Sequence, residues 1–154
     1  MKETTILGLD YGERRIGVAV SDTGKTLATG LVTIDCRRHP DYLENLSRIV
    51  RERRVEAIVV GYPVRTDGKP AAPGDKTAAV DAFIAALESR LGLPVHREDE
   101  SFTSAMAAES LRSRSRGRKR GSGRGRAAHA KAEIDRLAAC YILQDYLDHR
   151  VEAA

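Results

Sequence analysis

Three β-rich runs follow one another in the first 35 residues, and this arrangement limits the fold more than any other feature. The runs cover residues 4–10, 14–20 and 25–35, and the turn-like residues 21–25 connect the second to the third. Runs this close in sequence pair as antiparallel neighbours, because a parallel pairing needs a long crossover connection. The start of the chain is therefore predicted to form an antiparallel meander.

Beyond residue 40 the pattern changes to an alternation of helices and strands. Apolar residues at helical spacing, or short apolar runs, identify each element. The predicted elements are a helix from Pro40 or Asp41 to residue 54, a strand at 56–61, a helix at 76–92, a strand at 93–99, a helix at 103–113 and a closing helix at 131–150. Antiparallel hairpins followed by strand–helix alternation predict an α/β fold with one mixed sheet and helices on its faces.

Length and composition predict one soluble domain, which we assign to residues 1–150. The chain has 154 residues, of which 42% are hydrophobic and 31% charged. No apolar run approaches the roughly 20 residues that a membrane helix needs, and no signal peptide is recognisable, so we expect a cytoplasmic protein without a membrane partner. Cys36 and Cys140 match no paired ligand spacing, which argues against a zinc site or a disulfide.

Positive charge is concentrated in residues 112–131, which contain nine cations and no acid. The cations are Arg112, Arg114, Arg116, Arg118, Lys119, Arg120, Arg124, Arg126 and Lys131. The rest of the chain is net acidic, and one cationic segment on an acidic body favours a polyanion such as nucleic acid as partner. Serines and glycines among the arginines predict a basic loop that is mobile without its partner.

Two acidic positions lie where predicted strands end. Asp10 ends the first strand, a position that sheet proteins often use for ligands, although an aspartate before Gly12 is also typical of a hairpin turn. Asp99 and Glu100 end the last strand, where they could equally be solvated loop residues. Side chains alternate along a strand, so at most one of this pair faces Asp10.

The third acidic position is Asp135, which lies on an apolar stripe of the closing helix with Ala138, Ala139 and Ile142. A carboxylate turned toward a core is costly unless a cation or hydrogen bonds compensate it. An aspartate in the first turn of a helix, favoured by the helix dipole, is the alternative explanation. If the three positions converge, their hard oxygen donors favour Mg²⁺ or Mn²⁺, and such a centre beside a cationic segment is typical of a nuclease.

Four separated blocks of the chain resemble the YqgF/RuvX family of bacterial RNase H-like nucleases. They are ILGLDYGERRIGVAVSD, IVVGYP with DG downstream, LPVHREDESFTS and IDRLAACYILQDYLD, which together extend from residue 6 to residue 148. The resemblance implies a five-stranded RNase H-like sheet and a metal-dependent endonuclease. Members of the family act in Holliday junction resolution, and so in DNA recombination, or in 5′ maturation of pre-16S rRNA during ribosome biogenesis.

The resemblance also implies roles for individual residues. By motif position the catalytic and metal-binding acids are Asp10, Glu100 and Asp135, which selects Glu100 over Asp99 by analogy. Arg14 and Arg15 match a basic pair that could contact phosphate. Ser101 replaces the arginine usual in the family after Asp-Glu, and the extra arginines of residues 112–131 are expected to replace that charge. A junction resolvase cuts two opposed strands, so a homodimer is expected if that role holds.

Three other functions are less consistent with the sequence. SDTGKT ends like a phosphate-binding loop, but Ala19 stands where the earlier glycine is required and a strand follows instead of a helix. An actin- or hexokinase-like ATPase needs two lobes, for which the chain is too short. The alternative from another class is a non-catalytic nucleic-acid-binding or ribosome-assembly module that uses only the cationic segment.

Overall fold

The structure is a computed structural model that describes residues 3–63, 76–100 and 123–153. Its elements follow in the order β1 (Thr5–Tyr11), β2 (Arg15–Ser21), β3 (Ala28–Asp35), α1 (Tyr42–Glu52), β4 (Val55–Tyr62), α2 (Lys76–Leu91), β5 (Val95–Asp99) and α4 (Gly123–Ala153). The β-branched and aliphatic runs form the strands, and helical spacing of apolar residues forms α1 and α2, as predicted.

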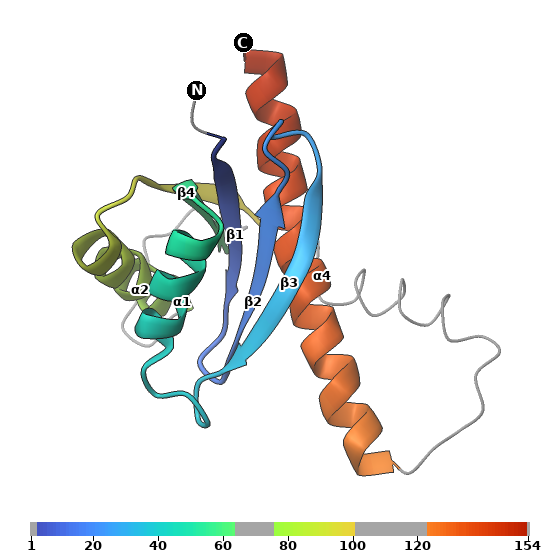
Figure 1. Cartoon of the computed structure of the whole chain (residues 1–154). Helices are drawn as coiled ribbons and strands as arrows, with labels where there is room; N and C mark the ends of the chain where they lie inside the picture. Colours follow the sequence, from blue (N-terminus) through green and yellow to red (C-terminus); the bar gives the residue numbers. More distant parts are fainter. Residues whose placement is uncertain (1–2, 64–75, 101–122, 154) are drawn as a thin grey trace, which may run out of the picture.

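The five strands form one mixed sheet in the order β3-β2-β1-β4-β5. β1 pairs antiparallel with β2, and β2 with β3, whereas β4 and β5 are parallel to β1. This confirms the predicted sheet of antiparallel hairpins followed by parallel strands. The carboxyl ends of the parallel strands β1, β4 and β5 therefore lie at the same end of the sheet, the end toward which β1 runs downward in Figure 1.

Helices cover both faces of the sheet. α1 and α2 lie on one face, and α4 crosses the other over β1, β2 and β3 (Figure 1). Leu7 and Leu9 of β1 join the cluster under α1 and α2, whereas Ile6 packs with α4. Because strand residues alternate, even-numbered β1 residues face α4 and odd-numbered residues face α1 and α2.

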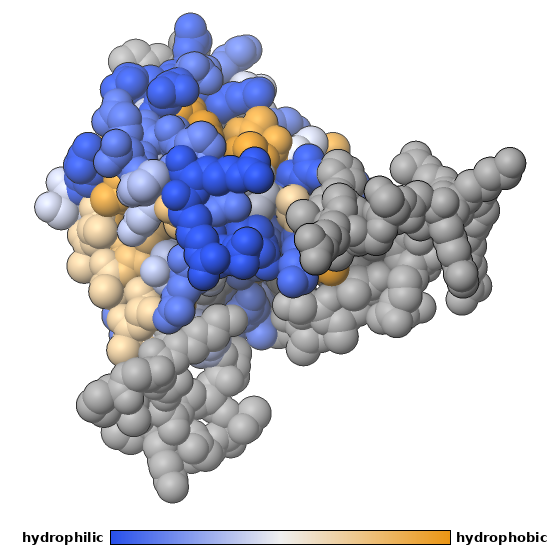
Figure 2. All heavy atoms as spheres, turned by 90° about the horizontal axis from the view of Figure 1, so that it is seen from below, coloured by the Kyte–Doolittle hydropathy of each residue, from blue (hydrophilic) through white to orange (hydrophobic). Residues whose placement is uncertain are grey.

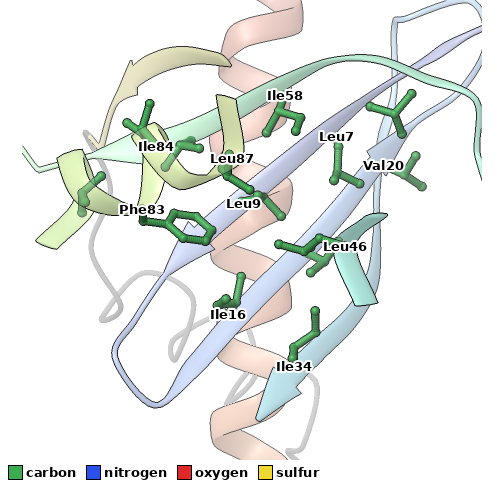
Figure 3. Packing of buried hydrophobic residues seen from close by; sticks show 14 residues of the cluster. Leu7, Leu9, Ile16, Val20, Ile34, Leu46, Ile58, Phe83, Ile84 and Leu87 are labelled. Carbon is green, nitrogen blue, oxygen red and sulfur yellow. The ribbon is translucent and has the colours of Figure 1, made fainter. Parts of the chain in front are cut away.

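The larger core lies between the sheet and α1 and α2. Figure 3 shows its aliphatic side chains projecting from the strands toward Leu46 of α1 and toward Phe83, Ile84 and Leu87 of α2. Leu7, Leu9 and Leu46 are completely buried. Burial of these side chains is the main stabilising contribution to this layer.

α4 begins earlier than the sequence pattern predicted. The basic loop was expected to extend to residue 131, but residues 123–131 belong to α4, so that part of the prediction is wrong. Alanines and arginines in this stretch have high helix propensity, and the helix continues through them despite the interspersed glycines. The remaining loop residues, 112–122, and the helix predicted at 103–113 lie outside the described residues. None of the described helices has the length and apolar character to cross a membrane.

Candidate active site

Asp10 lies within β1 and not in the hairpin turn that follows it. Its β1 neighbours on the same face are Ile6, which packs with α4, and Gly8, where a Cβ would lie 2.6 Å from Cβ of Leu143. Asp10 therefore faces α4. The next residue, Tyr11, faces the other way and stacks on Phe83 with ring centroids 4.3 Å apart, which fixes the end of β1 beside Asp10.

Gly17 allows α4 to approach the sheet directly beside Asp10. It is the cross-strand partner of Asp10 in the β1–β2 pairing. A Cβ at this position would overlap the backbone carbonyl oxygen of Asp135, so only glycine leaves room for the helix here. The contact brings the Asp135 segment of α4 over the strand pair that carries Asp10. Asp135 is far from the first turn of α4, so the helix dipole does not explain why an aspartate stands at this position.

The carboxylate of Asp135 is paired with Arg15. Arg15 Nε donates a hydrogen bond to Asp135 Oδ2 at 2.8 Å, between side chains that are 27% and 21% exposed. Arg15 begins β2 on the α4 face, two residues before Gly17, so strand alternation points it at the helix. The ion pair is the compensation that a carboxylate on an apolar stripe requires.

Glu100 follows the last residue of β5. Its backbone N–H donates to the carbonyl of Tyr62 at 2.9 Å, which continues the parallel pairing beyond Asp99. Along β5, His96 stacks on Tyr146 and Glu98 pairs with His149, both of α4. Alternation therefore places Glu100 on the α4 face, with Asp10 and Asp135, and Asp99 on the opposite face.

By donor chemistry these three carboxylates suit a hard divalent cation, which prefers oxygen ligands. Within residues 3–63, 76–100 and 123–153, however, no three Asp, Glu, His or Cys side chains lie close enough to hold one ion. Asp135 is turned to Arg15 instead. The three acids thus lie on one face of the sheet, and all of them offer carboxylate oxygens. To bind one ion, their side chains would have to move closer to one another.

α4 is held in place over the site by side-chain hydrogen bonds to β3 and the preceding turn. Thr33 Oγ1 donates to the carbonyl of Ala132 at 2.6 Å, one turn before Asp135. Further along α4, Gln144 accepts from the N–H of Ala28 and donates to the carbonyl of Thr26, both at 2.9 Å. These contacts fix the rotation of α4 that directs Asp135 toward the sheet.

Exposed arginines lie beside the site, and two of them were missed by the sequence analysis. Arg37 and Arg38 follow β3, and the N–H of Cys36 donates to the carbonyl of Arg14 at 2.8 Å, which brings these three exposed residues to the same end of the sheet. The pKa of Asp35 is lowered chiefly by the backbone N–H of Arg37, and further by that of Arg38 and by the charges of Arg14 and Arg38. Figure 2 views this end, where the described surface at the centre is hydrophilic.

Only three of the nine cations in the predicted cationic segment belong to the described residues. Lys131 is exposed on α4, and Arg124 and Arg126 belong to the first turns of the helix. The other six predicted cations lie outside the described residues: Arg112, Arg114, Arg116, Arg118, Lys119 and Arg120. Arg37 and Arg38 were overlooked because a pair of arginines in a loop has no motif, and only its placement next to Arg14 distinguishes it.

Known proteins resemble this chain in sequence and in fold. The sequence profile of RuvX, a Holliday junction resolvase family, matches residues 4–149. The chain belongs to the RuvX family. A relative from Chloroflexus aggregans named "Putative pre-16S rRNA nuclease" is 41% identical over 150 residues, which is 97% of each chain. One of the same name from Syntrophus aciditrophicus is 42% identical over 143 residues, covering 93% of this chain and 87% of the relative.

Solved structures place the RuvX-family chain in the RNase H-like fold. Thermus thermophilus RuvC in complex with a Holliday junction aligns with a TM-score of 0.51 at 18% identity, over 96% of both chains. The fowlpox virus resolvase in complex with Holliday junction DNA aligns with a TM-score of 0.53 at 9% identity, over 96% of this chain and 99% of the other. The predicted family and the predicted fold are both confirmed.

Proposed function

We propose that this RuvX-family protein is a divalent-metal-dependent endonuclease that hydrolyses phosphodiesters of structured nucleic acid. The observation that carries the proposal is the shared face of Asp10, Glu100 and Asp135. These residues come from β1, the end of β5 and α4, which are distant in sequence, and all three lie on the α4 side of the sheet. All three positions therefore offer carboxylate oxygens on the same side of the sheet, which is the donor type that a hard divalent cation prefers.

Asp10, Glu100 and Asp135 would hold Mg²⁺ or Mn²⁺. When bound, such an ion supplies Lewis-acid activation of water and of the scissile phosphate. Asp10 lies within β1 and Asp135 within α4, whose geometry limits the positions that these two carboxylates can adopt, and Glu100 directly follows β5. Arg14, together with Arg37 and Arg38, presents positive charge at the same end of the molecule, where it would attract the phosphates on either side of the cleaved bond.

The names of the relatives and of the structural neighbours indicate two substrates, junction DNA and precursor rRNA. Both present several phosphates in a fixed arrangement, which suits a carboxylate centre with cations beside it. We propose that the cations of residues 112–131 extend this phosphate-binding surface. A junction substrate would require two copies of the site, and hence a homodimer.

The proposal is tested by cleavage of a labelled four-way junction and a labelled pre-16S rRNA fragment, with Mn²⁺ or EDTA. We expect metal-dependent cleavage that falls by more than about a hundredfold in Asp10→Asn, Glu100→Gln and Asp135→Asn, since each removes a group that the chemistry requires. Asp99→Asn is the matched control, because it neutralises the adjacent carboxylate on the opposite face. Retained binding with no metal-dependent cleavage of either substrate would instead favour the non-catalytic binding module.

A further inference from the structure

The adjacent arginines Arg14 and Arg15 have different surroundings. Arg14 lies in the turn before β2, is exposed, and contributes positive charge near Asp35. Arg15 is the first residue of β2, about three quarters buried, and its Nε is hydrogen-bonded to Asp135 at 2.8 Å. The two neighbouring arginines thus differ in exposure and in partner: Arg14 is exposed and lies outside the strand, whereas Arg15 is paired with a carboxylate of α4.

We propose that Arg15 is the internal counter-ion of the candidate metal centre: it holds Asp135 in the absence of an ion and competes with a divalent cation for that carboxylate. The inference rests on the proposed function for the identity of the centre. Without Arg15, Asp135 would present an uncompensated carboxylate on the same face as Asp10. A guanidinium supplies the missing positive charge while the centre lacks an ion.

The competition follows from the position of the ion pair. Arg15 occupies Oδ2 of Asp135, one of the two oxygens that this residue could offer to an ion. A guanidinium and a divalent cation on one carboxylate repel each other strongly where water is partly excluded. Arg15 is thus a positioning residue, and the phosphate contact falls to Arg14.

The test is calorimetric titration of the full chain with Mn²⁺ alone. Removing a partly buried competitor should tighten binding, so Arg15→Gln is expected to bind Mn²⁺ about three- to tenfold more tightly than wild type. Arg14→Gln loses the same charge from the neighbouring position and should change the affinity by less than about twofold. Adding Asp135→Asn to Arg15→Gln should abolish the gain.

A second measurement separates Arg15 from a phosphate ligand. Binding of labelled junction DNA in EDTA should weaken in Arg14→Gln and stay at the wild-type level in Arg15→Gln. Mn²⁺ affinity that is unchanged or reduced in Arg15→Gln, or a loss of DNA affinity equal to that of Arg14→Gln, would overturn the inference. If Arg15→Gln does not fold, Arg15→Met decides in its place, because methionine removes the charge while keeping an unbranched apolar side chain; Mn²⁺ affinity equal to wild type would then count against the inference.

Failure of this inference can be told apart from failure of the proposed nuclease function. Wild-type cleavage with no gain of Mn²⁺ affinity in Arg15→Gln rejects the counter-ion role alone. A gain of affinity with no cleavage of either substrate supports the counter-ion role and rejects the nuclease. Absence of Mn²⁺ binding in every variant rejects both.

Discussion

The two faces of the sheet differ in the kinds of residue that the same strands present to the covering helices. Toward α1 and α2, β1 contributes Leu7 and Leu9, which are completely buried in the larger core. Toward α4, the same strand carries Gly8 and Asp10, and β2 contributes Gly17 and Arg15. Small residues let α4 approach closely, and charged residues occupy the end of that interface. The α4 face thus combines a close approach of the helix with charged side chains, whereas the other face is filled by large apolar side chains.

The largest expected effect is at Gly17, where the α4 face has no space. Gly17→Ala places a Cβ on the carbonyl oxygen of Asp135, so α4 must shift. We expect a loss of more than about 3 kcal/mol of unfolding free energy, measured by urea denaturation, together with loss of Mn²⁺ binding. The control is Gly24→Ala, whose Cβ would meet nothing closer than 3.4 Å and should change stability by less than about 0.5 kcal/mol. Wild-type stability of Gly17→Ala would disprove the close-approach argument.

On the face covered by α1 and α2, we expect stability to fall when a buried side chain is shortened. Leu9→Ala empties part of a fully buried position under α1 and α2 and should cost about 3 kcal/mol in the same measurement. Because Leu9 points away from α4, Mn²⁺ affinity of the folded variant should match wild type. Val32→Ala, at a side chain that is 37% exposed, is the control and should have a small effect. A large change in metal affinity in Leu9→Ala would show that the two faces are not independent.

A smaller effect is expected for the charge pair on the α4 face. A double-mutant cycle of Arg15→Gln and Asp135→Asn should give a coupling of about 1 kcal/mol in urea unfolding without metal, because both side chains are only about a quarter exposed. The corresponding cycle for Arg51 and Glu44, which are 66% and 51% exposed and 3.9 Å apart, should give about 0.3 kcal/mol or less. Equal couplings would mean that the α4 face does not strengthen its ion pair.

The smallest effect concerns the turn between β2 and β3. Asp22 accepts hydrogen bonds from the N–H of Leu27 and of Thr26, and these bonds, that of Leu27 first, lower its pKa. A lowered pKa in the folded state stabilises the protein above the ordinary carboxyl pKa of about 3.9, and this contribution is lost as the pH falls below that value. Asp22→Asn should therefore lose less stability than wild type between about pH 5 and pH 3 in thermal unfolding scans. Parallel pH profiles would contradict this.

Local sequence patterns determined the order of the elements, the mixed sheet and the three acidic positions. The alternation of large and small residues in β1 and β2 is a local property, so it could be read without knowing what covers each face. The choice of Glu100 over Asp99 came from family resemblance and stays a prediction; the contacts of His96 and Glu98 with α4 give only the face on which Glu100 lies.

Only the tertiary structure decided which groups meet. The ion pair of Arg15 with Asp135 joins residues separated by 120 positions, and it depends on the register of β2 and on the rotation of α4 set by Thr33 and Gln144. Such contacts follow from packing between elements, which no local pattern encodes. For the same reason the cluster of Arg37 and Arg38 with Arg14, and the approach of α4 at Gly17, emerged only from the folded chain.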